Sequence, residues 1–238
     1  MKNFFENSEY VFDPQRQTWS RPDYGGIAYN DGDEIEQRIA KIVEQASDLS
    51  VLSSELRQHC TDWPSLYHLS GTRANILRPF SDSLQGDILE IGAGCGAITR
   101  YLGEIGANVL ALEGSPRRAA IARARTSDLG NVTVLAEKFD KFKCAHKFDA
   151  ITLIGVLEYA NLFTPSANPA LSMLEHVCSL LKPDGKLIIA IENQLGLKYF
   201  AGAPEDHLGQ PMYGIEGRYR KDQPQTFGRE VVAGLLKH

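Results

Sequence analysis

The stretch that decides the fold is Glu90-Ile91-Gly92-Ala93-Gly94-Cys95-Gly96. It ends the short apolar run at residues 87–91, which is typical of a buried β-strand, and a helical pattern begins at residue 97. Its three glycines allow a tight turn and let a ligand approach the backbone where a helix starts. The stretch therefore predicts a strand, a ligand-binding loop and a helix in succession.

Strands and helices alternate along the chain behind Pro79. Further apolar runs rich in Val, Ile and Leu predict strands at residues 108–112, 132–135, 148–156 and 185–191. Helical patterns separate them at residues 97–105, 116–127 and 169–181. This alternation predicts an α/β fold with a doubly wound, mostly parallel sheet, whose ligands bind at the carboxyl ends of the strands.

The part before Pro79 has a different, mainly helical pattern. Asp33 and Glu36 have the spacing of a capping box, and Ile35, Ile39 and Val43 recur at helical intervals behind it. Two more helices are expected at residues 51–60 and 70–78, the second ended by Pro79, whereas the first thirty residues have no strong period. We therefore expect an N-terminal helical extension or cap at residues 1–79 and a ligand-binding domain at residues 80–238.

Composition limits the classes of function. The 238 residues are 43% hydrophobic and 23% charged, and the net charge of -5 makes nucleic acid an unlikely partner. No apolar run approaches the ~20 residues of a membrane span, and there is no signal-peptide pattern, so we expect a cytoplasmic protein. The four cysteines are scattered, with no C-x-x-C pair, and predict neither a metal site nor a disulfide framework.

The glycine loop alone fits two cofactors. Gly92, Gly94 and Ala97 also satisfy the dinucleotide pattern, and Glu113 at the end of the second strand offers a carboxylate to ribose hydroxyls. Either NAD or S-adenosylmethionine (SAM) would use these residues. An NAD-dependent oxidoreductase is therefore one alternative, although no second catalytic domain follows the short region behind the last strand.

Four features within residues 84–191 resemble the class I SAM-dependent methyltransferase family. Glu90 lies two residues before Gly92, as in the family's E-x-G-x-G-x-G motif. Residues 132–139 correspond to its adenine-contacting turn, residues 148–159 to its fourth-strand segment and residues 180–189 to its closing helix, turn and fifth strand. The resemblance implies a Rossmann-like fold that binds SAM.

The same resemblance implies a set of cofactor-binding residues. Lys138 stands where many members carry an acid that meets the adenine amine, and Tyr159 replaces a usual His. Arg73 in the N-terminal helical extension could pair with the carboxylate of the cofactor. The expected cofactor-binding residues are Glu90, Gly92, Ala93, Gly94, Gly96, Glu113, Gly114, Lys138, Phe139, Ile154, Tyr159 and Arg73.

Residues 192–209 form a polar, glycine-rich segment that is long for a connector, and such loops are usually functional or disordered. With residues 62–70 it resembles methyltransferase modules attached to bacterial glycosyltransferases and surface-polysaccharide enzymes. That resemblance implies O-methylation of a sugar or glycan hydroxyl, and possible fusion to a glycosyltransferase. His207, with Asp206 beside it, is the first choice for general base because imidazole titrates near neutral pH, and Glu158 is a reserve.

Other functions stay open. The acceptor could be a small metabolite instead of a glycan, or the chain could be a non-catalytic SAM-binding module of a larger assembly. Product formation separates the last case from an enzyme.

The family normally has seven strands, and only five are evident here. We expect the order 3-2-1-4-5 for these five, with the C-terminal strands missing and a truncated helix at residues 226–237. The fifth strand would then have an open edge, which invites a homodimer, a swapped element or cover by the N-terminal helices.

Overall fold

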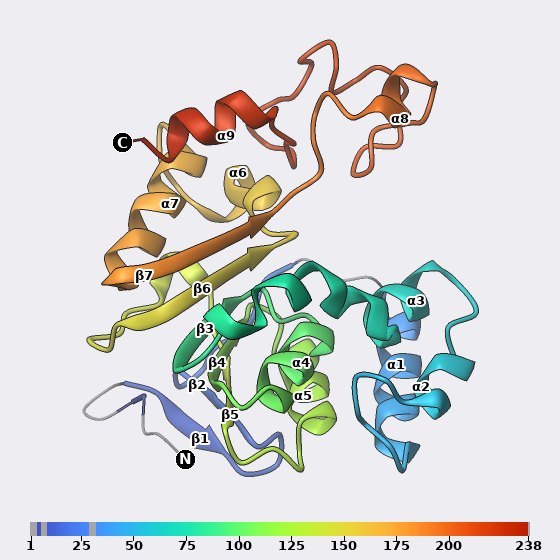
Figure 1. Ribbon diagram of the computed structural model, residues 1–238, viewed down its shortest axis with the longest axis vertical. Helices are drawn as coiled ribbons and strands as arrows, with labels where there is room; N and C mark the ends of the chain where they lie inside the picture. The colour runs from blue at the N-terminus through green and yellow to red at the C-terminus, as the bar shows by residue number, and fades with distance from the viewer. Residues whose placement is uncertain (1–3, 6–8, 29–31, 238) are drawn as a thin grey trace. The chain divides into compact units, whose positions relative to one another are not determined.

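The computed structural model describes residues 4–5, 9–28 and 32–237. Its described strands form one mostly parallel sheet in the order β1-β2-β5-β4-β3-β6-β7 (Figure 1). The strands are β1 Val11–Asp13, β2 Thr18–Ser20, β3 Asp87–Ile91, β4 Asn108–Glu113, β5 Val132–Ala136, β6 Phe148–Ile154 and β7 Leu181–Ala190. The last five have the predicted order 3-2-1-4-5, so the predicted doubly wound α/β fold is confirmed.

The centre of the sheet is buried on both faces. All residues of β3 and β5, and all but the first of β4, are buried, and the three strands pair in parallel. Leu89, for example, pairs with Leu110, which pairs with Thr133 on its other side. Continuous apolar runs are what a parallel strand between two layers requires, which is why these strands were evident in the sequence.

Helices connect the strands and flank them (Figure 1). They are α1 Asp33–Gln45, α2 Ser54–Gln58, α3 Trp63–Leu69, α4 Ala97–Glu104, α5 Pro116–Arg125, α6 Ala160–Phe163, α7 Pro169–Leu180, α8 Leu197–Phe200 and α9 Arg229–Leu235. The described residues also form short 3-10 helices: η1 Gly71–Ile76, η2 Arg78–Ser83, η3 Phe139–Lys141 and η4 Leu157–Tyr159. None of the described helices combines the length and the apolar character of a membrane-spanning segment.

The chain divides into two compact units. The first comprises Met1–Thr152 and Leu181–Lys186, and the second comprises Leu153–Leu180 and Leu187–His238. Strands β6 and β7 therefore contribute residues to both units. The boundary predicted near Pro79 stays a prediction about a change of sequence pattern.

The N-terminal segment contains a β-hairpin that the sequence did not predict. Strands β1 and β2 are antiparallel, and β2 continues the sheet beside β5, where Trp19 pairs with Leu135. Each strand has only three residues, too few for a period to be seen. The sheet is thus extended at its β5 edge, opposite to β7. The described residues between 193 and 237 contain two isolated bridges and no strand.

The predicted capping box of α1 is wrong, because Glu36 has stronger partners. Gly32 precedes the helix with φ 101° and offers no side-chain cap. The fully buried Glu36 carboxylate instead accepts hydrogen bonds from Arg117 and Arg118 of α5, the latter at 2.9 Å. Charge-assisted pairs of this kind are stronger than a neutral cap, so Glu36 joins α1 to α5.

The predicted apolar stripe of α1 is confirmed by its packing. Its buried members belong to one cluster with residues of α2, α3, α5 and the glycine loop. The buried residues of that cluster are Ile39, Val43, Leu56, Leu69, Cys95 and Ile121.

Three other predicted boundaries differ from the structure. The helix predicted at residues 70–78 is two 3-10 helices, and Pro79 lies in the first turn of η2, where its missing N–H is not needed. The helix predicted at residues 226–237 begins only at Arg229, as α9, and Thr226 before it hydrogen-bonds the Tyr219 hydroxyl at 2.6 Å. Strand β7 begins at Leu181 and includes Pro183, which an edge strand tolerates because one side of its backbone has no partner among the described strands.

Candidate functional site

The glycine loop between β3 and α4 has the left-handed backbone that its sequence predicts. Gly92, Gly94 and Gly96 have φ of 77°, 54° and 83°. A Cβ at Gly96 would lie 2.8 Å from the Ala122 Cα, so this glycine lets α4 and α5 approach. A Cβ at Gly94 would meet nothing within 4 Å. The loop therefore leaves open space over Gly94, as a backbone-contacting ligand requires.

Glu113 at the end of β4 is tied to this loop. Its Oε2 accepts a hydrogen bond from the Gly94 N–H at 2.7 Å, and its Oε1 accepts one from Ser115 at 2.9 Å. Burial raises the pKa of the Glu113 carboxyl, which the positive charge of Arg118 counteracts. Each carboxylate oxygen has a second lone pair, so both can also accept a hydroxyl. The predicted ribose-binding acid thus also shapes the loop.

Glu90, at the start of the glycine loop, and Arg73 each contain a buried polar atom that lacks a hydrogen-bond partner among the described residues. Within the described residues, Glu90 Oε2 and Arg73 Nε are buried atoms with no hydrogen-bond partner. Burial, aided by the charge of Glu113, raises the pKa of Glu90 to about 7, and Arg73 is close enough to lower it. The Arg73 guanidinium lies 3.9 Å from the ring centre of Tyr67. Buried polar atoms normally have partners, so this carboxylate and guanidinium fit a ligand that carries both an ammonium and a carboxylate.

At the end of β5 the structure brings forward a residue that the sequence reasoning missed. Lys138 is exposed and Phe139 is half-buried at the start of η3. The buried acid is Glu137, whose carboxylate accepts hydrogen bonds from the Arg21 guanidinium and, at 2.7 Å, from the Lys138 N–H. The sequence could have indicated Glu137, because ligands of parallel sheets bind where strands end. Glu137 directly follows β5, as Gly114 follows β4.

The segment behind β2 covers Gly114. The Tyr24 hydroxyl donates to the Gly114 carbonyl at 2.7 Å, and the Ile27 N–H donates to the same oxygen at 3.2 Å. A Cβ at Gly114 would lie 2.6 Å from the Ile27 Cδ1. Close packing against Ile27 therefore requires a glycine at position 114, whether or not this residue also contacts a ligand.

The predicted catalytic residues belong to the second compact unit, together with Ile154 and Tyr159 of the expected cofactor-binding set. Ile154 ends β6, and Glu158 lies buried in η4 next to Tyr159. The His207 Nε2 lies 3.9 Å from a Glu158 carboxylate oxygen, and the His207 ring meets the Tyr159 ring edge-to-face at 5.4 Å. The structure thus brings Glu158, Tyr159 and His207 together although 48 residues separate the last two.

Asp206 does not accompany His207 as expected. Its carboxylate accepts hydrogen bonds from the Lys198 ammonium at 2.7 Å and from the Tyr199 hydroxyl. The acid that contacts the His207 ring is Glu205, whose Oε1 lies 3.2 Å from the Nδ1. Two adjacent acids thus serve different partners, and Glu205, not Asp206, contacts the His207 ring.

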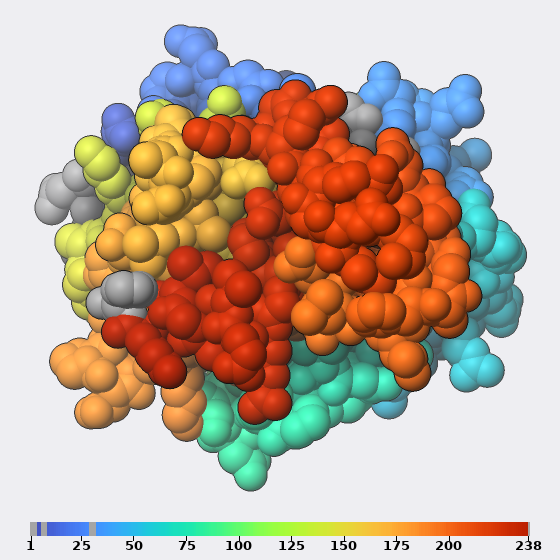
Figure 2. All heavy atoms as spheres, turned by 90° about the horizontal axis from the view of Figure 1, so that it is seen from above, coloured from blue at the N-terminus to red at the C-terminus, as the bar shows by residue number. Residues whose placement is uncertain are grey.

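A third carboxylate, Glu192, lies near His207. One ligand atom each from Glu158, Glu192 and His207 lie within 4.8 Å of one another. The sequence predicted no metal site, and these residues are far apart in the chain. The grouping makes an electronegative, acceptor-rich centre that suits hydroxyl or cationic groups. Figure 2 shows the segment behind β7 in orange to red.

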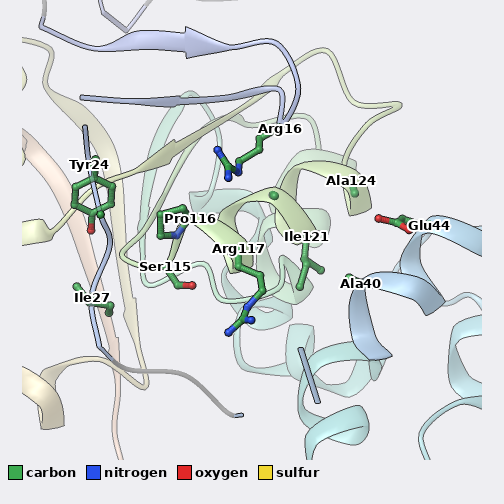
Figure 3. Close-up of a pocket in the computed structure, with 12 residues that line it drawn as sticks. Arg16, Tyr24, Ile27, Ala40, Glu44, Ser115, Pro116, Arg117, Ile121 and Ala124 are labelled. Atoms are coloured by element: carbon green, nitrogen blue, oxygen red, sulfur yellow. The ribbon is translucent and has the colours of Figure 1, made fainter. Parts of the chain in front are cut away.

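A cavity of about 630 Å³ lies elsewhere in the first unit (Figure 3). It is lined by Arg16, by the segment behind β2 with Tyr24 and Ile27, by α1 and by α5 with Arg117. None of the predicted cofactor-binding residues lines it, and Arg117 is already paired with Asp33 and Glu36. The cavity is therefore not the site that the glycine loop indicates.

Comparison with known proteins gives one family match. Residues 89–187 match the family model described as a methyltransferase domain. A demethylmenaquinone methyltransferase of Tropheryma whipplei is 31% identical over 103 residues, 43% of this chain and 40% of that protein. A ubiquinone biosynthesis O-methyltransferase of Xanthomonas axonopodis is 28% identical over 45% of this chain and 43% of its own length. The chain thus spans about half or less of the length of these curated relatives.

Solved structures show the same fold over a longer part of the chain. DhpI in a complex with SAM and HEP superposes with a TM-score of 0.52 and 18% identity, over 88% of this chain and 90% of its own. Magnesium protoporphyrin IX methyltransferase from Synechocystis, with bound S-adenosylhomocysteine, gives a TM-score of 0.50 and 20% identity over 70% and 69%. Both resemblances support the Rossmann-like class I methyltransferase fold.

Proposed function

We propose that this chain, whose residues 89–187 form a methyltransferase domain of the class I SAM-dependent type, binds SAM and methylates an acceptor hydroxyl. The observation that carries the proposal is the pair of buried, unsatisfied atoms Glu90 Oε2 and Arg73 Nε beside an open glycine loop. SAM supplies a methyl group that its sulfonium already activates.

The first unit supplies the groups that would hold the cofactor. Glu90 would accept hydrogen bonds from the ammonium of the methionine end, and Arg73 would donate to its carboxylate. Glu113 would accept hydrogen bonds from the ribose hydroxyls with the lone pairs that Gly94 and Ser115 leave free. Lys138 and Phe139 would border the adenine, with Phe139 offering a ring face.

The same residues weigh against NAD. A dinucleotide carries a pyrophosphate at its glycine loop, and a buried carboxylate at this place opposes an anion. Glu90 is such a carboxylate, 3% exposed. The amino-acid end of SAM satisfies Glu90 and Arg73 together, which a nicotinamide dinucleotide does not.

We assign the acceptor side to the His207 centre of the second unit. Methyl transfer to a hydroxyl needs an acceptor oxygen in line with the activated methyl group and a base for the hydroxyl proton. His207 Nε2 would take that proton, and the resulting imidazolium would be stabilised by the carboxylates of Glu158 and Glu205.

The proposed acceptor is a sugar or glycan hydroxyl. Glu158 and Glu192 are hydrogen-bond acceptors only, so together with His207 they suit a group that offers several O–H donors. The polar segment at residues 192–209 and its likeness to surface-polysaccharide modules support the same acceptor. A small metabolite is the second candidate acceptor. Two relatives are named as a demethylmenaquinone methyltransferase and a ubiquinone biosynthesis O-methyltransferase, which supports that candidate.

Two measurements test the proposal in order. Calorimetry with SAM and with reduced NAD should give binding of SAM alone, and Glu90→Gln and Arg73→Gln should each weaken it. Mass spectrometry of sugar and metabolite acceptors, after incubation with isotopically labelled SAM, then identifies the methylated oxygen. Binding of SAM without any transfer would make the chain a non-catalytic module.

A further inference from the structure

We propose that Glu205 is the positioning residue for His207, and that it fixes the tautomer in which Nε2 is free to accept a proton. This inference rests on the proposed role of His207 as the base. Glu205 is 2% exposed and belongs to the same compact unit as His207. Glu205 would act through the imidazole ring, because its carboxylate contacts the His207 Nδ1, whereas Glu158 lies nearer the Nε2.

The Glu205 carboxylate is held by four donors. Its Oε2 accepts hydrogen bonds from the N–H groups of His207 at 2.8 Å and Leu208 at 2.7 Å. Its Oε1 lies 3.2 Å from the His207 Nδ1 and 3.2 Å from the Tyr219 hydroxyl. Backbone donors from the same loop thus hold the carboxylate rigidly beside the imidazole ring. A charged acceptor held in this way gives strong hydrogen bonds with a fixed direction.

The contact decides which ring nitrogen carries the proton. Both Glu205 oxygens act as acceptors, so the His207 Nδ1 must be the donor in their shared hydrogen bond. In a neutral imidazole the other nitrogen then carries a lone pair. The His207 Nε2 lies 3.9 Å from Glu158, beyond hydrogen-bond length, so nothing in that contact requires a proton there. The ring is therefore preset to accept a proton at Nε2.

Tyr219 extends the same network. Its hydroxyl donates to the Glu205 Oε1 and lies 2.6 Å from the Thr226 Oγ1, so Thr226 can donate its own hydroxyl proton to Tyr219 while Tyr219 donates to Glu205. A Cβ at Gly214 would lie 2.5 Å from that hydroxyl, which leaves the Tyr219 side chain little freedom. Tyr219 thus holds the Glu205 Oε1, whereas the loop backbone holds the Oε2.

Asp206 provides a matched control within the same loop. It is the next residue, it carries the same charge and its carboxylate is bonded to Lys198 and Tyr199. If charge alone near His207 were sufficient, removal of either carboxylate would have the same effect. The positioning role requires that only Glu205 matters for the ring.

The experiment compares Glu205→Gln with Asp206→Asn in the full chain. Nitrogen-15 NMR of labelled histidine, assigned through His207→Ala, reads the tautomer without cofactor or acceptor. We expect Nδ1–H in the unmodified protein and in Asp206→Asn, and a loss of that preference in Glu205→Gln, whose amide can donate to Nδ1. Turnover of Glu205→Gln should fall ~10²-fold or more, with SAM affinity within about twofold.

A second variant keeps the test sharp if Glu205→Gln unfolds. Tyr219→Phe keeps the carboxylate, so the Nδ1–H tautomer should persist and turnover should fall by less than about tenfold. An unchanged tautomer in folded Glu205→Gln, or an equal loss of turnover in Asp206→Asn, overturns the positioning role. If the tautomer depends on Glu205 but His207→Ala keeps full turnover, the base assignment fails instead, which the activity-free NMR readout distinguishes.

Discussion

Replacing Glu90 by Gln should stabilise the protein without its cofactor, and the gain should depend on pH. The carboxyl of Glu90 has a pKa raised from 4.5 to about 7 by burial. Between these two values the folded protein binds a proton that the unfolded chain has released. The free energy of unfolding therefore falls as the pH rises through this window, and the full loss is present above pH 7.

The magnitude follows from the shift. A change from 4.5 to about 7 corresponds to about 3 kcal/mol at 1.36 kcal/mol per unit. Glu90→Gln has the same shape and does not titrate, so it should gain up to that amount over the unmodified protein at pH 8. At pH 5 the folded carboxyl is already protonated, and the gain should shrink to less than about 1 kcal/mol.

Urea unfolding followed by circular dichroism at pH 5 and pH 8 measures both values. Glu44→Gln, which removes an exposed carboxylate of α1, is the control and should change neither. Saturating SAM should reverse the order at pH 8, since its ammonium would pair with Glu90 and not with Gln. A gain that is the same at both pH values, or a loss at pH 8, would refute the reasoning that Glu90 is a buried acid kept for a cationic partner.

Three other outcomes follow from the site. Glu113→Ala should weaken SAM binding about tenfold or more, because hydrogen bonds to a charged acceptor contribute ~1.5–3 kcal/mol; an unchanged dissociation constant by calorimetry, with the fold intact, would exclude the ribose contact. His207→Ala should lower turnover ~10²–10⁴-fold with SAM affinity nearly unchanged; an equal loss of SAM affinity would make His207 structural. Because proton removal is assigned to the His207 Nε2 and not to a cation held with Glu158 and Glu192, turnover should persist in excess chelator; a loss that Mn²⁺ or Mg²⁺ restores would give the centre to a metal ion.

The sequence predicted the core of the sheet because its strands are buried on both faces. Such strands must be apolar along their whole length, and β3, β4 and β5 were predicted to within a residue. The glycine loop could be predicted equally well, since the positive φ at Gly92, Gly94 and Gly96 favours glycine. Where backbone geometry or double-sided burial restricts the residue type, the sequence is informative.

The parts that could not be predicted depend on the direction of a side chain or on very short elements. Nothing in the order Glu205-Asp206-His207 says that Glu205 contacts the ring while Asp206 is bonded to Lys198. The three-residue strands β1 and β2 show no period of their own and exist because β5 offers an edge to pair with. The partners of Glu36 are likewise set by tertiary packing that a local capping pattern cannot include.

The proposed reaction transfers a methyl group from SAM to an acceptor hydroxyl. The most direct test is to incubate the protein with SAM that carries a ¹³C-labelled methyl group and a panel of sugar acceptors, and to record NMR and mass spectra of the products. We expect a ¹³C methyl ether on one acceptor oxygen, formed together with an equal amount of S-adenosylhomocysteine and strongly reduced with His207→Ala. Binding of SAM with no labelled product from any sugar or metabolite, or label on carbon or nitrogen only, would contradict it.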